Sequence, residues 1–392
     1  MRNWLVIAVA AAVTLPGVAL EAALYGVSTP AIEALIFGVA IVGAAFLLSW
    51  VAEVLQLDVS QGLALGLLAL IAVLPEYIVD ATFAWKAAVD PAYAEYAVAN
   101  MTGANRLLIG IAWPLVVLLG WLRWRQRKVD LEPGHGLELV VLLVATIYAV
   151  ILPLKHTISL VDLVVLGSIF AFYIWRLSRL PAEPPHLVGP AETIGALPAV
   201  TRRLVTTALA LGAAMAILAV AEPFAEALVH TGTEFGIDEF LLVQWLAPLA
   251  SEAPEFVVVS IFAWRGASGA AMGTLVSSKI NQWTLLVGML PLIYGISLGA
   301  ANPLPLGVRQ QHELLLTVAQ TFFAVALMLD LRLHLYGAAM LFGLFVAGFI
   351  WPDHHVALAG VYIALAVIAL VVQRQGIREA LRHVRGMFGQ AT

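Results

Sequence analysis

Two acidic residues, Glu76 and Glu255, each follow a proline in the middle of a long apolar stretch. The first stretch reads LIAVLPEYIVDATFAWK and the second reads LASEAPEFVVVSIFAWR, so the aromatic and basic residues after the two Pro-Glu pairs also align. An ionisable side chain at membrane depth is costly and marks an ion pathway or a proton relay. Proline removes a helical hydrogen bond, which lipid-exposed backbone does not tolerate. The pattern therefore predicts two interrupted helices whose carboxylates face protein or a wet cavity.

Each Pro-Glu stretch is followed by a second polar, glycine-bearing stretch, AVANMTGANRLLIG at 97–110 and AAMGTLVSSKINQW at 270–283. Carboxylate, amide and hydroxyl oxygens suit hard cations such as calcium, sodium or magnesium. Backbone carbonyls freed by the prolines, at Ile71 and Ala250, would add neutral ligands. We expect Glu76 and Glu255 to bind the metal ion, within a larger set of candidate cation ligands: Glu76, Glu255, Asp80, Asn100, Asn105, Ser251, Glu252, Ser277 and Ser278.

Two basic residues, Lys279 and Arg106, lie within these same stretches. An ammonium group among carboxylates can act as a tethered cation, or it can exchange a proton. We therefore expect both residues to compensate charge near the site. An ion pair between one of them and Glu252 or Asp80 is the competing use of those acids.

Composition assigns the chain to the membrane class. Of its 392 residues, 62% are hydrophobic and only 11% are charged, whereas a soluble domain has about 25% charged residues. The chain has no cysteine, which excludes disulfides and thiolate metal sites, and no nucleic-acid-binding surface is visible. The expected partners are inorganic cations and membrane lipid.

The apolar segments predict an all-α polytopic membrane protein with about 12 spans, within a range of 10 to 12. One extra helix is expected at each end of two inverted five-helix repeats. The N-terminal apolar run is interpreted as a span, with a cleaved signal peptide as the alternative. The expected spans are 4–24, 31–55, 61–86, 93–121, 137–154, 157–177, 202–229, 238–264, 268–297, 311–331, 333–350 and 355–373.

Basic residues orient these spans, because cytoplasmic loops are enriched in lysine and arginine. With the N-terminus inside, fifteen basic residues fall in inside segments and three, Lys86, Lys155 and Arg309, fall outside. We therefore expect an integral protein of the cell (inner) membrane with both termini cytoplasmic. The two Pro-Glu spans then run in opposite directions, which is typical of the inverted repeats of secondary transporters.

Five regions follow from this topology. The expected division is an extra N-terminal helix at 1–30, a first inverted repeat at 31–177, a cytoplasmic linker at 178–201, a second inverted repeat at 202–350, and an extra C-terminal helix with a basic tail at 351–392.

The chain resembles the calcium:cation antiporter superfamily, the sodium/calcium exchangers and their relatives. The resemblance is carried by Leu74-Pro75-Glu76 and Ala253-Pro254-Glu255, followed by Asn100 to Asn105 and Gly273 to Lys279. It implies a ten-helix core, a midplane site shared by the two glutamates, and alternating access that couples calcium to sodium or protons. The transported ions would be Ca²⁺, Na⁺ or H⁺, and no cofactor is implied.

The chain departs from the family pattern at three places. Ala72-Val73 and Ser251-Glu252 replace the Thr-Ser that precedes Pro-Glu in the family, and Lys279 replaces an amide or acid. The leading hypothesis is a secondary-active antiporter of Ca²⁺ against Na⁺ or H⁺. The alternative is a Na⁺/H⁺ exchanger in which Lys279 is the tethered or titrating charge. No nucleophile–base pair or metal-binding His-Glu motif is present, so we do not expect an enzyme.

Overall fold

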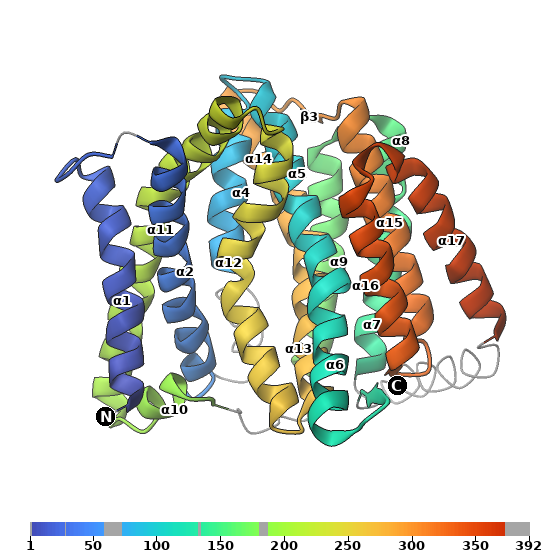
Figure 1. Ribbon diagram of the computed structural model, residues 1–392, viewed down its shortest axis with the longest axis horizontal. Helices are drawn as coiled ribbons and strands as arrows, with labels where there is room; N and C mark the ends of the chain where they lie inside the picture. The colour runs from blue at the N-terminus through green and yellow to red at the C-terminus, as the bar shows by residue number, and fades with distance from the viewer. Residues whose placement is uncertain (1, 28, 59–72, 132–134, 180–186, 373–392) are drawn as a thin grey trace. The chain divides into compact units, whose positions relative to one another are not determined.

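Helices account for nearly all of the computed structural model, which describes residues 2–27, 29–58, 73–131, 135–179 and 187–372 (Figure 1). In the N-terminal half these are α1 (Arg2–Glu21), α2 (Pro30–Leu55), α4 (Leu74–Lys86), α5 (Ala92–Leu107), α6 (Trp113–Trp124), α7 (Gly136–Ala149), α8 (Ile151–Lys155), α9 (Leu160–Leu177) and α10 (Pro190–Gly195). In the C-terminal half they are α11 (Ala199–Phe235), α12 (Glu239–Trp264), α13 (Ser268–Asn281), α14 (Val287–Leu298), α15 (Val308–Leu327), α16 (Leu335–Ile350) and α17 (His355–Val372). The predicted all-α fold is confirmed.

Nine helical segments of the described chain are long and apolar enough to cross a membrane, and the 16-residue helix α16 is a shorter apolar one. Most begin and end within a few residues of the expected spans. The first part of the span expected at 61–86 lies outside the described residues, as do Ile71 and the basic tail beyond residue 372. The part of the expected linker at 180–186 also lies outside them.

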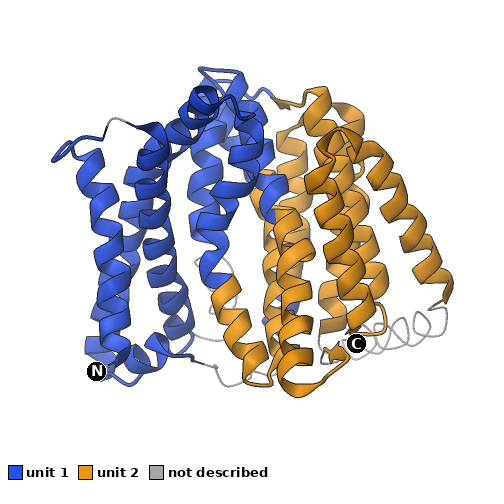
Figure 2. Ribbon diagram, in the orientation of Figure 1, with its two compact units in different colours: residues 1–104, 174–255, 289–302 blue, residues 105–173, 256–288, 303–392 orange. Residues whose placement is uncertain are grey.

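The chain divides into two compact units, shown in different colours in Figure 2. Unit 1 comprises Met1–Ala104, Ile174–Glu255 and Met289–Asn302. Within it, α11 packs along α2 and also contacts α1 and α4. Helices α1 and α2 approach closely at Gly43, where an added Cβ would lie 2.6 Å from the carbonyl oxygen of Ala10. Small residues at such contacts let helix backbones meet without a hydrophobic driving force.

Unit 2 comprises Asn105–Tyr173, Phe256–Gly288 and Pro303–Thr392. Within it, α15 packs on α17 and α7, and α13 packs on α6 and α7. Two short antiparallel sheets join distant parts of this unit. Strand β1 (Lys128–Asp130) pairs with β4 (Arg332–His334), and β2 (Thr157–Ile158) pairs with β3 (Leu304–Pro305). Each sheet thereby ties a loop of the N-terminal half to a loop of the C-terminal half.

A π-helical turn interrupts each of the two polar helices. The turn Leu108–Ala112 separates α5 from α6, and the turn Gln282–Leu286 separates α13 from α14. Aligning Asn105 with Lys279 also superposes the two turns residue for residue. Single π-turns inside helices are rare and concentrate at functional sites. Nothing in the sequence analysis predicted them.

Candidate cation-binding site

The first Pro-Glu pair lies at the beginning of a helix. Helix α4 starts at Leu74, so Pro75 occupies the first turn, where its missing N–H removes no intrahelical bond. Glu76 is also in this first turn, where the partial positive charge of the helix N-terminus favours a carboxylate.

The second Pro-Glu pair lies inside a helix. Here the expected interruption is wrong, because α12 continues through both Pro248 and Pro254. A helix can retain its overall course at a proline by kinking, at the loss of one hydrogen bond. The carbonyl of Ala250 still receives no N–H from residue 254, as expected, since proline has no amide hydrogen.

Unit 1 brings the two glutamates together. The Glu76 carboxyl is close enough to that of Glu255 for their charges to interact, and the Ser251 hydroxyl lies within hydrogen-bonding reach of Glu76. Glu76 is only 2% exposed, and Glu255 is partly exposed. Glu252, on the turn of α12 before Glu255, is fully buried. These four residues come from α4 and α12, the two helices that carry the Pro-Glu pairs.

Asp80 and Asn100 form a second buried polar pair in unit 1. Nδ2 of Asn100 donates a 2.7 Å hydrogen bond to Oδ1 of Asp80. Asp80 is one turn beyond Glu76 on α4, and its charge is also within interaction range of Glu76. Both side chains are at most 1% exposed. Unit 1 therefore gathers six of the nine candidate cation ligands around two adjacent polar positions.

Unit 2 holds the other candidates. Nζ of Lys279 donates a 2.5 Å hydrogen bond to Oδ1 of Asn105 and lies 4.5 Å from the centre of the Trp283 ring. Both Lys279 and Asn105 are completely buried. The lysine is thus held by an amide oxygen and an aromatic face.

Arg106 makes an ion pair that the sequence analysis missed. Its Nη2 lies 2.7 Å from Oε2 of Glu313 on α15, and Nδ1 of His355 on α17 lies 2.9 Å from the other oxygen of the same carboxylate. The histidine Nε2 is 3.1 Å from the carbonyl oxygen of Gly348. The sequence carried one signal for this ion pair, because Glu313 is an acid within the span expected at 311–331.

Ser277 belongs to a further hydrogen-bonded group in unit 2. Its hydroxyl bonds to that of Tyr173, which donates a 3.0 Å hydrogen bond to Glu138, and Glu138 in turn lies 2.7 Å from Nδ1 of His135. Ser278, the adjacent candidate, is 7% exposed. Glu138 was not among the predicted site residues, although it is an acid within an apolar span.

Comparison with known proteins places the chain in a family. The model for "sodium/calcium exchanger protein" matches residues 31–179 and 205–351, which is well over half of the chain. The chain belongs to the sodium/calcium exchanger family. The resemblance stated from the Pro-Glu motifs is therefore confirmed.

Solved structures of exchangers share this fold. The chain is similar, at 41% identity and a TM-score of 0.94, to a crystal structure of the H⁺/Ca²⁺ exchanger CAX, covering 100% of this chain and 99% of that one. The native YfkE structure matches at 15% identity and a TM-score of 0.64, over 93% of this chain and 100% of that chain. The sodium-calcium exchanger NCX_Mj matches at 15% identity and a TM-score of 0.54, over 81% and 97%. No curated protein sequence matches the chain.

This exchanger-family chain is accordingly an integral membrane protein and a cation antiporter, and its relatives are transporters rather than enzymes. Across its described residues, no three His, Asp or Glu side chains converge closely enough to hold a metal ion by themselves. A cation bound by the glutamates of this family member would therefore take its remaining ligands from hydroxyl, amide or carbonyl oxygens and from water.

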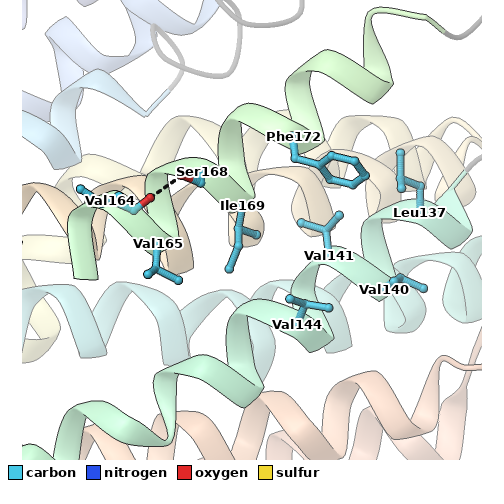
Figure 3. A pocket seen from close by; sticks show the side chains of 9 residues that line it. All are labelled: Leu137, Val140, Val141, Val144, Val164, Val165, Ser168, Ile169 and Phe172. Carbon is cyan, nitrogen blue, oxygen red and sulfur yellow. Dashed lines mark hydrogen bonds between the residues drawn. The ribbon is translucent and has the colours of Figure 1, made fainter. Parts of the chain in front are cut away.

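An apolar pocket of about 420 Å³ lies between α7 and α9 of the exchanger, in unit 2 (Figure 3). Eight of its nine lining residues are apolar, and the ninth, Ser168, donates its hydroxyl to the carbonyl oxygen of Val164 on its own helix. None of the candidate ligands lines it. An oxygen-poor pocket of this kind does not suit a hard cation.

Proposed function

We propose that the protein exchanges Ca²⁺ for protons across the membrane. The observation that carries the proposal is the approach of the buried Glu76, on α4, to Ser251 and the partly exposed Glu255, both on α12. The 41% identity to an H⁺/Ca²⁺ exchanger over the full length of both chains supports Ca²⁺ and H⁺ as the exchanged ions.

The chemistry of two carboxyl groups accounts for antiport. Two ionised carboxylates neutralise one Ca²⁺, and oxygen ligands from Ser251 and the Ala250 carbonyl can complete its shell. When each carboxyl instead holds a proton, the pair is also neutral, and a low-dielectric site tolerates both loaded states better than an empty, doubly charged one. One Ca²⁺ and two H⁺ therefore compete for the same groups, and alternating access converts the competition into exchange.

The test is Ca²⁺ uptake into proteoliposomes driven by an imposed pH gradient. E76Q and E255Q are expected each to abolish uptake, because either change removes one of the two carboxylates that the proposal assigns to the cation. E95Q, at an exposed position on α5, is the matched control and is expected to retain uptake. Uptake that survives both E76Q and E255Q would end the shared-site proposal.

A second candidate, Na⁺/H⁺ exchange, is favoured by one observation. Lys279 is completely buried and its ammonium group is held by Asn105. A positive charge on Lys279, whether tethered or titrating, would disfavour a divalent ion relative to a monovalent one. Na⁺-driven proton movement without Ca²⁺ uptake, in the same proteoliposomes, would support this candidate over the first.

We also propose that the protein lies in the cell (inner) membrane with both termini cytoplasmic, and that the repeats extend over 31–177 and 202–350. The distribution of basic residues supports the orientation. Reporter fusions at each terminus test the orientation. A reporter that fluoresces only in the cytoplasm is expected to be active at both ends, and a reporter that is active only outside the cell is expected to be inactive at both ends.

A further inference from the structure

Gln244 is a buried amide that finds no hydrogen-bonding partner among the residues that the structure describes. Its side chain lies within the apolar run of α12 and is 0% exposed. Throughout the part of the chain that the structure describes, neither Nε2 nor Oε1 of Gln244 has a partner. Leaving a buried amide unsatisfied costs about 1–3 kcal/mol, and such a group calls for a water or an ion as its explanation.

The position of Gln244 on its helix aligns it with the proposed site. Ser251 and Glu255 follow it by seven and eleven residues, so all three lie on one face of α12. Along the helix axis, Gln244 is about 10 Å from Ser251. The amide therefore lies about two turns from Ser251 and about three turns from Glu255, on the side toward the beginning of α12.

A contact with α5 places Gln244 beside the second polar pair. An added Cβ on Gly103 would lie 3.1 Å from Cγ of Gln244 and 1.9 Å from its carbonyl oxygen. Asn100, which is hydrogen-bonded to Asp80, precedes Gly103 by one helical turn on the same face of α5. Gln244 thus contacts α5 about one helical turn away from Asn100, the residue that is hydrogen-bonded to Asp80.

Three buried side chains in this region, those of Asp80, Asn100 and Gln244, have an oxygen atom that makes no hydrogen bond to any residue the structure describes. Oδ2 of Asp80 and Oδ1 of Asn100, like the Gln244 amide, have no hydrogen-bond partner among the described residues. Oxygen atoms of carboxylates and amides are ligands of a hard cation and also acceptors for its hydration water.

We propose that Gln244 binds the transported divalent cation, or a water of its hydration shell, at a second position about two helical turns from Ser251, on the side toward the beginning of α12. The proposal rests on the proposed function, because it assigns Gln244 a place in the same cation pathway. The residue would then determine how readily a partly dehydrated cation reaches the glutamates.

The test compares Q244M with Q310M in pH-gradient-driven Ca²⁺ uptake. Methionine keeps the length of the side chain and removes its polar atoms. Gln310 is a matched control, because it is buried like Gln244 (1% exposed) and neither of its side-chain polar atoms has a partner among the described residues. Its helix, α15, carries no candidate ligand. Q244M is expected to raise the half-saturating Ca²⁺ concentration about fivefold to tenfold, the change that follows from losing one neutral ligand. Q310M is expected to leave it unchanged.

A half-saturating concentration within twofold of the parent for Q244M would overturn the proposal. If Q244M does not yield monodisperse protein, Q244L is measured in the same way. E76Q and E255Q, assayed alongside, separate the two failures. Loss of uptake in both glutamate variants with no effect of Q244M sinks only the role of Gln244, whereas uptake that persists in both glutamate variants sinks the proposed function itself.

Discussion

Lys279 donates a 2.5 Å hydrogen bond to Asn105, the residue that aligns with it in the other polar stretch. Two positions related by an internal repeat meet only near the axis that relates the repeats. The ammonium group is completely buried, so its charge is weakly screened.

Replacing Lys279 by methionine is expected to strengthen Ca²⁺ binding. Loss of one positive charge from a low-dielectric region relieves repulsion of an incoming cation, and we expect the half-saturating Ca²⁺ concentration to fall roughly three- to tenfold. Uptake assays measure this, with K128M, at a surface lysine that is 40% exposed, as the control. An unchanged or higher value for K279M would mean that the lysine serves packing against Trp283 instead.

Breaking the buried ion pair between Arg106 and Glu313 is expected to destabilise the protein. Both side chains are almost inaccessible, so R106M or E313Q alone leaves an unbalanced buried charge and should cost about 3–5 kcal/mol of unfolding free energy. The double variant R106M/E313M should lose markedly less, because neither charge remains. Thermal unfolding of the purified protein measures all three, and equal losses that simply add in the double variant would contradict this account.

Glycine at position 103 is expected to be indispensable. An alanine Cβ would lie 1.9 Å from the Gln244 carbonyl oxygen, well inside contact distance, so G103A must push α5 and α12 apart. We expect a loss of about 1–3 kcal/mol in stability together with loss of Ca²⁺ uptake. Gly212 on α11 has nothing within 4 Å of its added Cβ, so G212A should be neutral or slightly stabilising. Melting temperature and uptake that are unaltered in G103A would argue against the close contact.

Asp58, beyond the end of α2, is expected to stabilise the protein only above acidic pH. A hydrogen bond from Arg202, together with one from Arg203, lowers the pKa of Asp58 from 3.8 to about 2. Because the folded-state pKa is the lower one, the stabilisation is present above pH 3.8 and disappears as the pH falls toward 2. D58N should therefore lower the melting temperature at pH 7, and the difference from the parent should shrink between pH 4 and pH 2. D353N, at an exposed position, is the control, and a difference that is independent of pH would count against the ion pairs.

The positions of most helices were predictable because length and hydropathy alone determine a span. The two acids of the proposed cation site were selected from the sequence because Pro-Glu occurs twice within apolar runs, and the structure brings their side chains close together. The course of α12 through Pro254 was not predictable, because a kink and a break remove the same hydrogen bond and only packing decides between them. The partner of Arg106 was equally inaccessible, since Glu313 lies more than two hundred residues away along the chain.

Gln244 shows a different limit of the sequence. A single glutamine in an apolar helix is more often a packing residue than a ligand, so the sequence alone gave no reason to select Gln244 as a candidate ligand. Its significance appears only when Gly103, on another helix, is seen to lie against it.

The two prolines of α12 have a mechanical consequence. Pro248 and Pro254 each remove one backbone hydrogen bond from α12, and Ser251 and Glu252 lie in the short stretch between them. A helix that lacks two nearby backbone hydrogen bonds bends there more readily than elsewhere. The two bending points of α12 therefore flank the candidate ligands Ser251 and Glu252. Opening and closing of the pathway can then arise from bending of α12 alone. The same bend would also move the oxygen atoms that we propose as cation ligands.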